Sequence, residues 1–154
     1  MNKLTVLLSA VFALLAPVAV HAMDHSSMKM DHGAHRGDVA HEEIVDGMKA
    51  TFKVMSMKEH MKAMDMEMPK GMKETHHIAV EFKDAKTGMA LTEGEVKIKV
   101  QNPDKSDQSK DLMGMQGHFG ADFDMSKTGK YGVMCKFLLK DGKVHSSKFW
   151  YTAK

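Results

Sequence analysis

Residues 129–139 read GKYGVMCKFLL, and this stretch decides the fold. It has an apolar side chain at every second position. These side chains belong to Tyr131, Val133, Cys135, Phe137 and Leu139. Such alternation is typical of a β-strand with one buried face, because successive side chains of a strand point to opposite sides. We therefore predict a strand here, with the thiol of Cys135 in the core as a small hydrophobic group.

Shorter alternating patterns occur on both sides of this stretch. They cover residues 48–55, 78–82, 96–100, 109–115, 119–123 and 145–152. Asp124 followed by Gly129-Lys130-Tyr131 also has the pattern of a tyrosine corner. Seven short strands at this spacing predict an all-β fold, a seven-stranded antiparallel β-sandwich of the immunoglobulin-like class.

The first 47 residues are predicted to lie outside the sandwich. Lys3, the apolar run Leu4–Leu15 and the small residues that end at Ala22 form a signal peptide over residues 1–22. This segment indicates export, to the periplasm in a Gram-negative cell, without insertion into a membrane. Residues 23–47 have few large aliphatic side chains and are expected to form a flexible His- and Met-rich tail. The sandwich domain would then cover residues 48–154.

Methionine and histidine are unusually frequent in this chain. Seventeen of the 154 residues are Met and ten are His. Met is normally a scarce filler of gaps in cores, so packing alone does not require this excess. The formal net charge is only +2 at pH 7, which is not the basic footprint of a nucleic-acid-binding protein. We find no catalytic motif and expect a monomeric protein that is not an enzyme.

The greatest concentration of possible metal donors is MKEHMKAMDMEMPKGMKETHH, at residues 57–77. Its candidate ligands are His60, Met61, Met64, Met66, Met68, His76 and His77. Methionines from Met57 to Met68 recur at helical spacing, so this connection between the first two strands is a Met-rich loop or a short helix. The same stripe can instead pack as a cap on the open end of the sandwich. By strand parity, His76 faces inward and His77 faces outward.

A tighter motif is the turn MGMQGH at residues 113–118, whose two glycines allow a sharp reversal of the chain. Met113, Met115 and His118 are candidate ligands of an ion that accepts few donors, as Cu(I) and Ag(I) do. Met113 and Met115 also share the parity of Phe119, so they can instead fill the core. If the strands run strictly up and down, this turn and residues 57–77 lie at opposite ends, which predicts two separate donor clusters.

The tail supplies a third, looser set of donors. His25, His32 and His35 lie there among several Met residues. His-rich segments of this kind bind metals, and imidazole suits copper. The tail is therefore a candidate site for Cu(II).

Several of these features together resemble the small exported β-sandwich copper proteins. They are the signal peptide, the strand pattern over residues 49–154, the Met113–His118 turn and the sequence Gly129-Lys130-Tyr131-Gly132. The resemblance is to YtkA-like domains and, more distantly, to CopC-type copper-resistance carriers. It implies an immunoglobulin-like fold and the handling of copper in the periplasm. CopC-type carriers bind Cu(II) through a histidine that is the first mature residue, and cleavage after Ala22 removes His21.

The leading hypothesis is therefore a Cu(I)- or Ag(I)-binding protein that acts as a metallochaperone or sequestering factor. Thioether sulfur selects such soft ions. The recipient would be an efflux pump or a component of cytochrome assembly. One alternative is an adaptor module that uses its flexible Met side chains to bind a partner protein. Another is an oxidant sink, in which exposed Met is converted to the sulfoxide.

Overall fold

The computed structural model describes residues 37–154, which belong to one compact unit. The predicted signal peptide and the tail histidines His25, His32 and His35 lie outside the described residues, so the predictions about them stay predictions. Within the described part of the chain, no helix has the length and hydrophobicity needed to cross a membrane.

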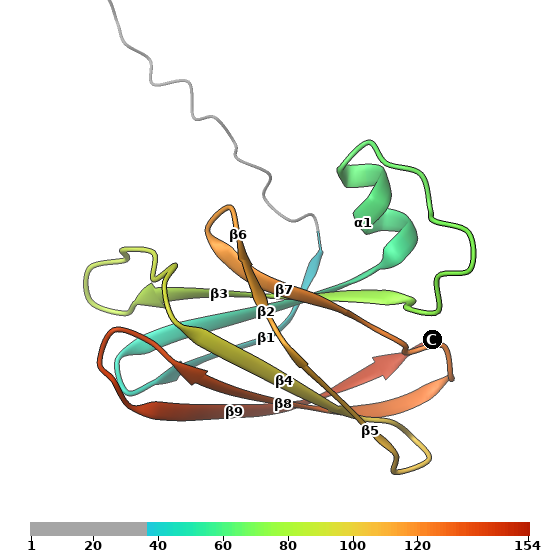
Figure 1. Ribbon diagram of the computed structural model, residues 1–154. Helices are drawn as coiled ribbons and strands as arrows, with labels where there is room; N and C mark the ends of the chain where they lie inside the picture. The colour runs from blue at the N-terminus through green and yellow to red at the C-terminus, as the bar shows by residue number, and fades with distance from the viewer. Residues whose placement is uncertain (1–36) are drawn as a thin grey trace, which may run out of the picture. The chain divides into compact units, whose positions relative to one another are not determined.

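Nine strands and one helix make up the described residues. In chain order they are β1 (Asp38–Val45), β2 (Met48–Ser56), α1 (Met57–Ala63), β3 (His76–Asp84), β4 (Glu95–Gln101), β5 (Asp107–Asp111), β6 (Met113–Met115), β7 (His118–Phe123), β8 (Gly129–Leu138) and β9 (Val144–Ala153). The strands form two sheets, with the orders β1-β2-β3-β7-β6 and β5-β4-β8-β9 (Figure 1). Every pair of neighbouring strands is antiparallel. The predicted all-β antiparallel sandwich is confirmed.

The core lies between the inner faces of the two sheets. Its fully buried side chains include Phe52, Ile78, Val80, Phe82, Ile98, Phe123, Val133, Cys135 and Phe137. Tyr131 is buried too, and its hydroxyl donates to the carbonyl of Lys127 at 2.7 Å, which is the predicted tyrosine corner. Burial raises the pKa of the Cys135 thiol to about 12. The sulfur therefore stays protonated and acts as a core group.

Strand β1 extends the sandwich into the region predicted as tail. It pairs along β2, with His41 opposite Phe52 and Glu43 opposite Ala50, so the sandwich already includes residues 38–45. The alternation is hidden in the sequence because two residues of β1 that face inward, His41 and Glu43, are polar. Backbone hydrogen bonds and the stacking of His41 on Phe149 (ring centroids 4.9 Å apart) hold the strand instead.

The predicted fourth strand, at residues 109–115, is divided between the sheets. Its first part lies in β5, which pairs with β4, and its last part is β6, which pairs with β7. Buried Leu112 lies between them. This division, together with β1, accounts for nine strands in place of seven.

Candidate metal centre

The connection between β2 and β3 begins as helix α1, of seven residues. Ser56 caps its N-terminus. The Ser56 hydroxyl accepts a hydrogen bond from the backbone N–H of Glu59, and the Glu59 carboxylate accepts one from the N–H of Ser56. This capping box satisfies two backbone donors that a helix start leaves open. The helix buries Met57, His60 and Met61.

Helix α1 packs on the outer face of the first sheet, above the end formed by β2 and β3 (Figure 1). Four buried apolar residues lie outside the main core cluster: Met55, Met57, Met61 and Ala79. In the sheet register His77 lies opposite Met55 on β2 and opposite Asp122 on β7, so these three share the outer face. The helix thus creates a second, small buried cluster.

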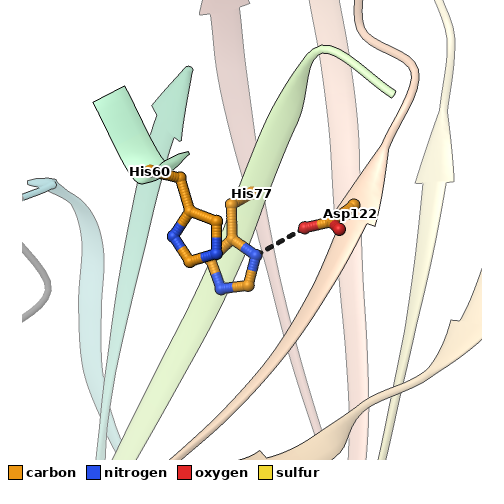
Figure 2. A group of neighbouring side chains, drawn as sticks. All are labelled: His60, His77 and Asp122. Atoms are coloured by element: carbon orange, nitrogen blue, oxygen red, sulfur yellow. Dashed lines mark hydrogen bonds and ion pairs between the residues drawn. The ribbon is translucent and has the colours of Figure 1, made fainter. Parts of the chain in front are cut away.

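His60 and His77 lie together at the centre of this cluster, and both are buried. Their rings are stacked, with centroids 3.8 Å apart and 6° between the planes. Nδ1 of His77 lies 2.6 Å from a carboxylate oxygen of Asp122. Figure 2 shows the two overlapping rings and the contact from His77 to Asp122. One possible ligand atom from each of the three residues lies within 4.8 Å of the others.

The contact with Asp122 determines what His77 can do. A carboxylate accepts a hydrogen bond, so Nδ1 of His77 carries the hydrogen, and the lone pair belongs to Nε2. Nε2 lies over Gly120, where an added Cβ would come within 2.6 Å of it. The methyl carbon of Met115 lies 3.2 Å from the same point. The imidazole nitrogen and the methyl end of the Met115 thioether therefore approach one spot above Gly120.

His118 completes the cluster from the first position of β7. Its side chain is buried, and its ring lies 6.5 Å from that of His77 at an angle of 77°. Met115 and His118 are directly opposite in the β6–β7 pair, so they share a face of the sheet. The two nearly perpendicular rings do not cover each other as stacked rings would, so a nitrogen of each can face a common ion. His77, His118 and Met115 are therefore neighbours on one face of the sheet and remain candidate ligands.

His60 has a different geometry. The lone pair of an imidazole lies in the plane of its ring, and the planes of His60 and His77 are nearly parallel. An ion in the plane of His77 therefore lies out of the plane of His60. Although these atoms are close enough for a shared ion, their directions are not suitable. In this arrangement His60 covers His77 and excludes water.

The electrostatics of the cluster favour neutral imidazoles. Burial, and secondly the neighbouring His77, lowers the pKa of both His60 and His118 below the usual value of 6.5. The hydrogen bond from His77 lowers the pKa of Asp122. An imidazole must be unprotonated to bind a metal. At neutral pH the two buried rings are therefore in the form that a metal requires.

The prediction of two donor clusters at opposite ends is wrong for the described residues, because His118 and His77 belong to one cluster. Strand β7 pairs only with residues 76–80 of β3, so its first residue, His118, lies beside the middle of β3. Helix α1 then folds back over this face. The turn from Met115 to His118 therefore lies near α1 rather than at the far end.

The core alternative for Met113 and Met115 is also wrong. Gln116 and Gly117 both have positive φ, and the tight turn pairs Met115 with His118. This pairing places both methionines on the outer face. Met115 is 39% exposed beside His77, whereas Met113 is 72% exposed.

The other predicted ligands among the described residues lie outside the histidine cluster, except for buried Met61, which follows His60 on α1. Met64, Met66 and Met68 are exposed in the chain that follows α1. His76 is half-buried, as its inward parity predicts, and its Nδ1 lies 2.9 Å from the hydroxyl of Thr75. Its ring meets Tyr151 edge-on.

Sequence reasoning missed Asp122 and Gly120. Both lie on β7 at alternate positions after His118, so they share its face. The pattern His-x-Gly-x-Asp is the signal that could have identified them. Gly leaves space for a neighbouring ring, and Asp can orient a histidine.

Comparison with known proteins identifies the fold. No family model and no curated protein matches the sequence. A copper-bound variant of FetP from uropathogenic Escherichia coli strain F11 has 14% identity and a TM-score of 0.54, over 73% of this chain and 93% of that one. A copper-bound variant of Campylobacter jejuni P19 has 12% identity and a TM-score of 0.55, over 75% and 95%. A DUF4426 family protein from Pseudomonas aeruginosa PAO1 has 12% identity and a TM-score of 0.55, over 73% of this chain and 93% of that one. These proteins share the sandwich architecture.

Proposed function

We propose that this protein binds copper as Cu(I), and Ag(I) in its place, through His77, His118 and Met115. The observation that carries the proposal is the approach of His77 Nε2 and the methyl end of the Met115 thioether to one point above Gly120, with the ring of His118 nearly perpendicular to that of His77. Asp122 fixes the tautomer of His77 and acts as a positioning residue. His60 covers the centre.

The donor set favours a soft ion. Thioether sulfur is a neutral, soft donor that selects Cu(I), and imidazole suits copper as well. Protein zinc sites are built from thiolate, imidazole and carboxylate, yet the Cys135 thiol is buried in the core and the Asp122 carboxylate is engaged with His77. Two proteins with the same fold are described as copper-bound, which supports copper.

The biological role that fits is that of an exported carrier or sequestering protein. The signal peptide proposed for residues 1–22 would deliver the chain to the periplasm. The half-exposed thioether of Met115 leaves one side of the centre accessible to a partner, whereas α1 protects the other. An efflux pump or a cytochrome-assembly component is the proposed recipient, and the carrier itself is proposed to be monomeric.

An anaerobic Cu(I) titration of the exported protein against a coloured chelator tests the centre. Replacing His77 or His118 with Ala, or Met115 with Leu, should each weaken binding by about tenfold or more, because each change removes a ligand. Met113→Leu is the matched control, since Met113 lies on the same hairpin but is 72% exposed. The proposal fails if the three variants bind as the control does, or if Zn(II) displaces Cu(I) at equal concentration.

A further inference from the structure

Helix α1 ends in a geometry that brings two methionines together. The backbone N–H of Met66 donates to the carbonyl of Met61 at 2.9 Å, and that of Asp65 donates to the carbonyl of Lys62 at 3.2 Å. Asp65 has a φ of 55°. These features define a Schellman motif, in which the second residue beyond the cap contacts the third-last residue of the helix. Here those two residues are Met66 and Met61.

Met68 joins this pair. Met61, Met66 and Met68 together line one open depression beside α1. Met61 is buried, whereas Met66 is 55% and Met68 is 45% exposed. Packing accounts for Met61, which helps to fill the space under the helix. It does not account for Met66 and Met68, which leave much of their apolar surface in water, where burial would be favourable.

The charged residues around the depression balance one another. Two cationic residues, Lys58 and Lys62, and two anionic residues, Asp65 and Glu67, line it. A site for a divalent cation would be expected to carry an excess of carboxylates. A balanced rim around neutral thioethers suits a monovalent, soft ion instead.

We propose that Met61, Met66 and Met68 form a second, solvent-facing site for Cu(I) or Ag(I), from which the ion passes to the buried histidines. Met61 is the connecting residue, because it lines the depression and is also buried next to His60 on α1. The passage is a ligand exchange. A bond from the ion to sulfur breaks as a bond to imidazole nitrogen forms, and no electron is transferred.

The outer site can be tested separately from the histidine centre, although the passage of the ion rests on the proposed function. Ag(I) is the probe, because it does not change oxidation state, and NMR of methyl-labelled methionine in the exported protein is the readout. The methyl signals of Met61, Met66 and Met68 should shift together as Ag(I) is added. They should still shift in His77→Ala, which lacks the inner centre.

A double substitution, Met66→Leu with Met68→Leu, should abolish the shift at Met61 and slow the loading of the histidine centre by about tenfold or more, because the ion is no longer concentrated beside it. The equilibrium affinity of the inner centre should stay unchanged. Met89→Leu is the matched control, since Met89 is 67% exposed and lies at the C-terminal end of β3, where its carbonyl accepts from the N–H of Asp84.

The two proposals fail in different ways. If the His77, His118 and Met115 variants keep their affinity while the outer methyl signals respond to Ag(I), the function proposed for the inner centre is wrong and the outer site stands. If the double Leu variant keeps the Ag(I) shift at Met61 and loads as fast as Met89→Leu, the outer site is overturned. Loss of affinity at the inner centre in the double variant would also overturn it, because it would place Met66 or Met68 in that centre.

Discussion

The ring of His60 on α1 covers the ring of His77 on β3, with 3.8 Å between centroids and 6° between planes. The two residues lie on consecutive elements of the chain, and the stack exists because α1 folds back over the outer face of the first sheet. The stack shields one face of the His77 ring. It does not place a lone pair of His60 in the plane of the His77 ring, where an ion bound to His77 would lie. The stack therefore separates the role of His60 from that of the proposed ligands.

Replacing His60 with Phe should leave Cu(I) affinity within about threefold of the wild type, because Phe preserves an aromatic stack, worth about 1 kcal/mol. Replacing His60 with Ala should destabilise the domain by about 1–3 kcal/mol, since it removes a buried side chain. Urea unfolding and chelator competition measure the two effects. A tenfold loss of affinity in His60→Phe would contradict the covering role and make His60 a ligand.

Asp122 is expected to act through His77 rather than on the ion. Asp122→Asn keeps the shape but loses the carboxylate, so Nδ1 of His77 is no longer obliged to carry the hydrogen. Cu(I) affinity should fall about 10- to 100-fold, the usual effect of losing such a partner. Nitrogen NMR of His77 should show a change in its tautomer.

Asp107→Asn is the control for this change, because Asp107 forms an exposed ion pair with Lys99 on the other sheet. A direct ligand role for Asp122 would appear as lost affinity with an unchanged His77 tautomer. That outcome would contradict the positioning role.

The stability of the metal-free domain should fall as the pH drops below 6.5. Burial lowers the pKa of three histidines, His60, His76 and His118, in the folded state below the ordinary value of 6.5. Between the lowered pKa and 6.5 the unfolded chain binds more protons than the folded one, so the free energy of unfolding decreases with decreasing pH. The full contribution is present above 6.5. Urea midpoints across this range measure it.

His60→Phe should flatten this dependence, because one of the three histidines with a lowered pKa no longer titrates. Met113→Leu should leave it as in the wild type. An equally steep profile in His60→Phe and in the wild type would show that other groups dominate the acid response.

Much of the sandwich could be predicted because its strands bury one face. Alternate apolar residues in 129–139 correspond to β8, and Cys135 lies in the core as its parity predicts. Strand β1 escaped prediction because His41 and Glu43, rather than apolar residues, occupy its inner face. Its position depends on hydrogen bonds to β2, and a sequence pattern carries no information about them.

The candidate centre was only partly predictable for a related reason. Parity correctly placed His77 on the outer face, but parity does not say which strands are neighbours. The pairing of β3 with β7 brings the rings of His77 and His118 together and adds Asp122. The covering by α1 is also a tertiary effect, because the helix is short and its sequence does not specify the direction in which it folds back.

Gly120 provides the sharpest test of the geometry. A Cβ at this position would come within 2.6 Å of His77 Nε2 and 3.2 Å of the Met115 methyl group. Its backbone φ is not in the left-handed region, so Ala is compatible with the strand. Gly120→Ala should therefore displace the ring of His77. Cu(I) affinity should fall by about tenfold or more, whereas overpacking should cost about 1–3 kcal/mol of stability.

Gly114→Ala is the matched control for this substitution. Gly114 lies on the neighbouring strand β6, and the nearest atom to an added Cβ there is a ring carbon of Phe119 at 3.7 Å, an ordinary contact. This variant should keep both its stability and its Cu(I) affinity. A methyl group beside Nε2 of His77 should disturb a bond from that nitrogen to the ion. If Gly120→Ala nevertheless binds Cu(I) as tightly as Gly114→Ala does, Nε2 of His77 does not face the ion.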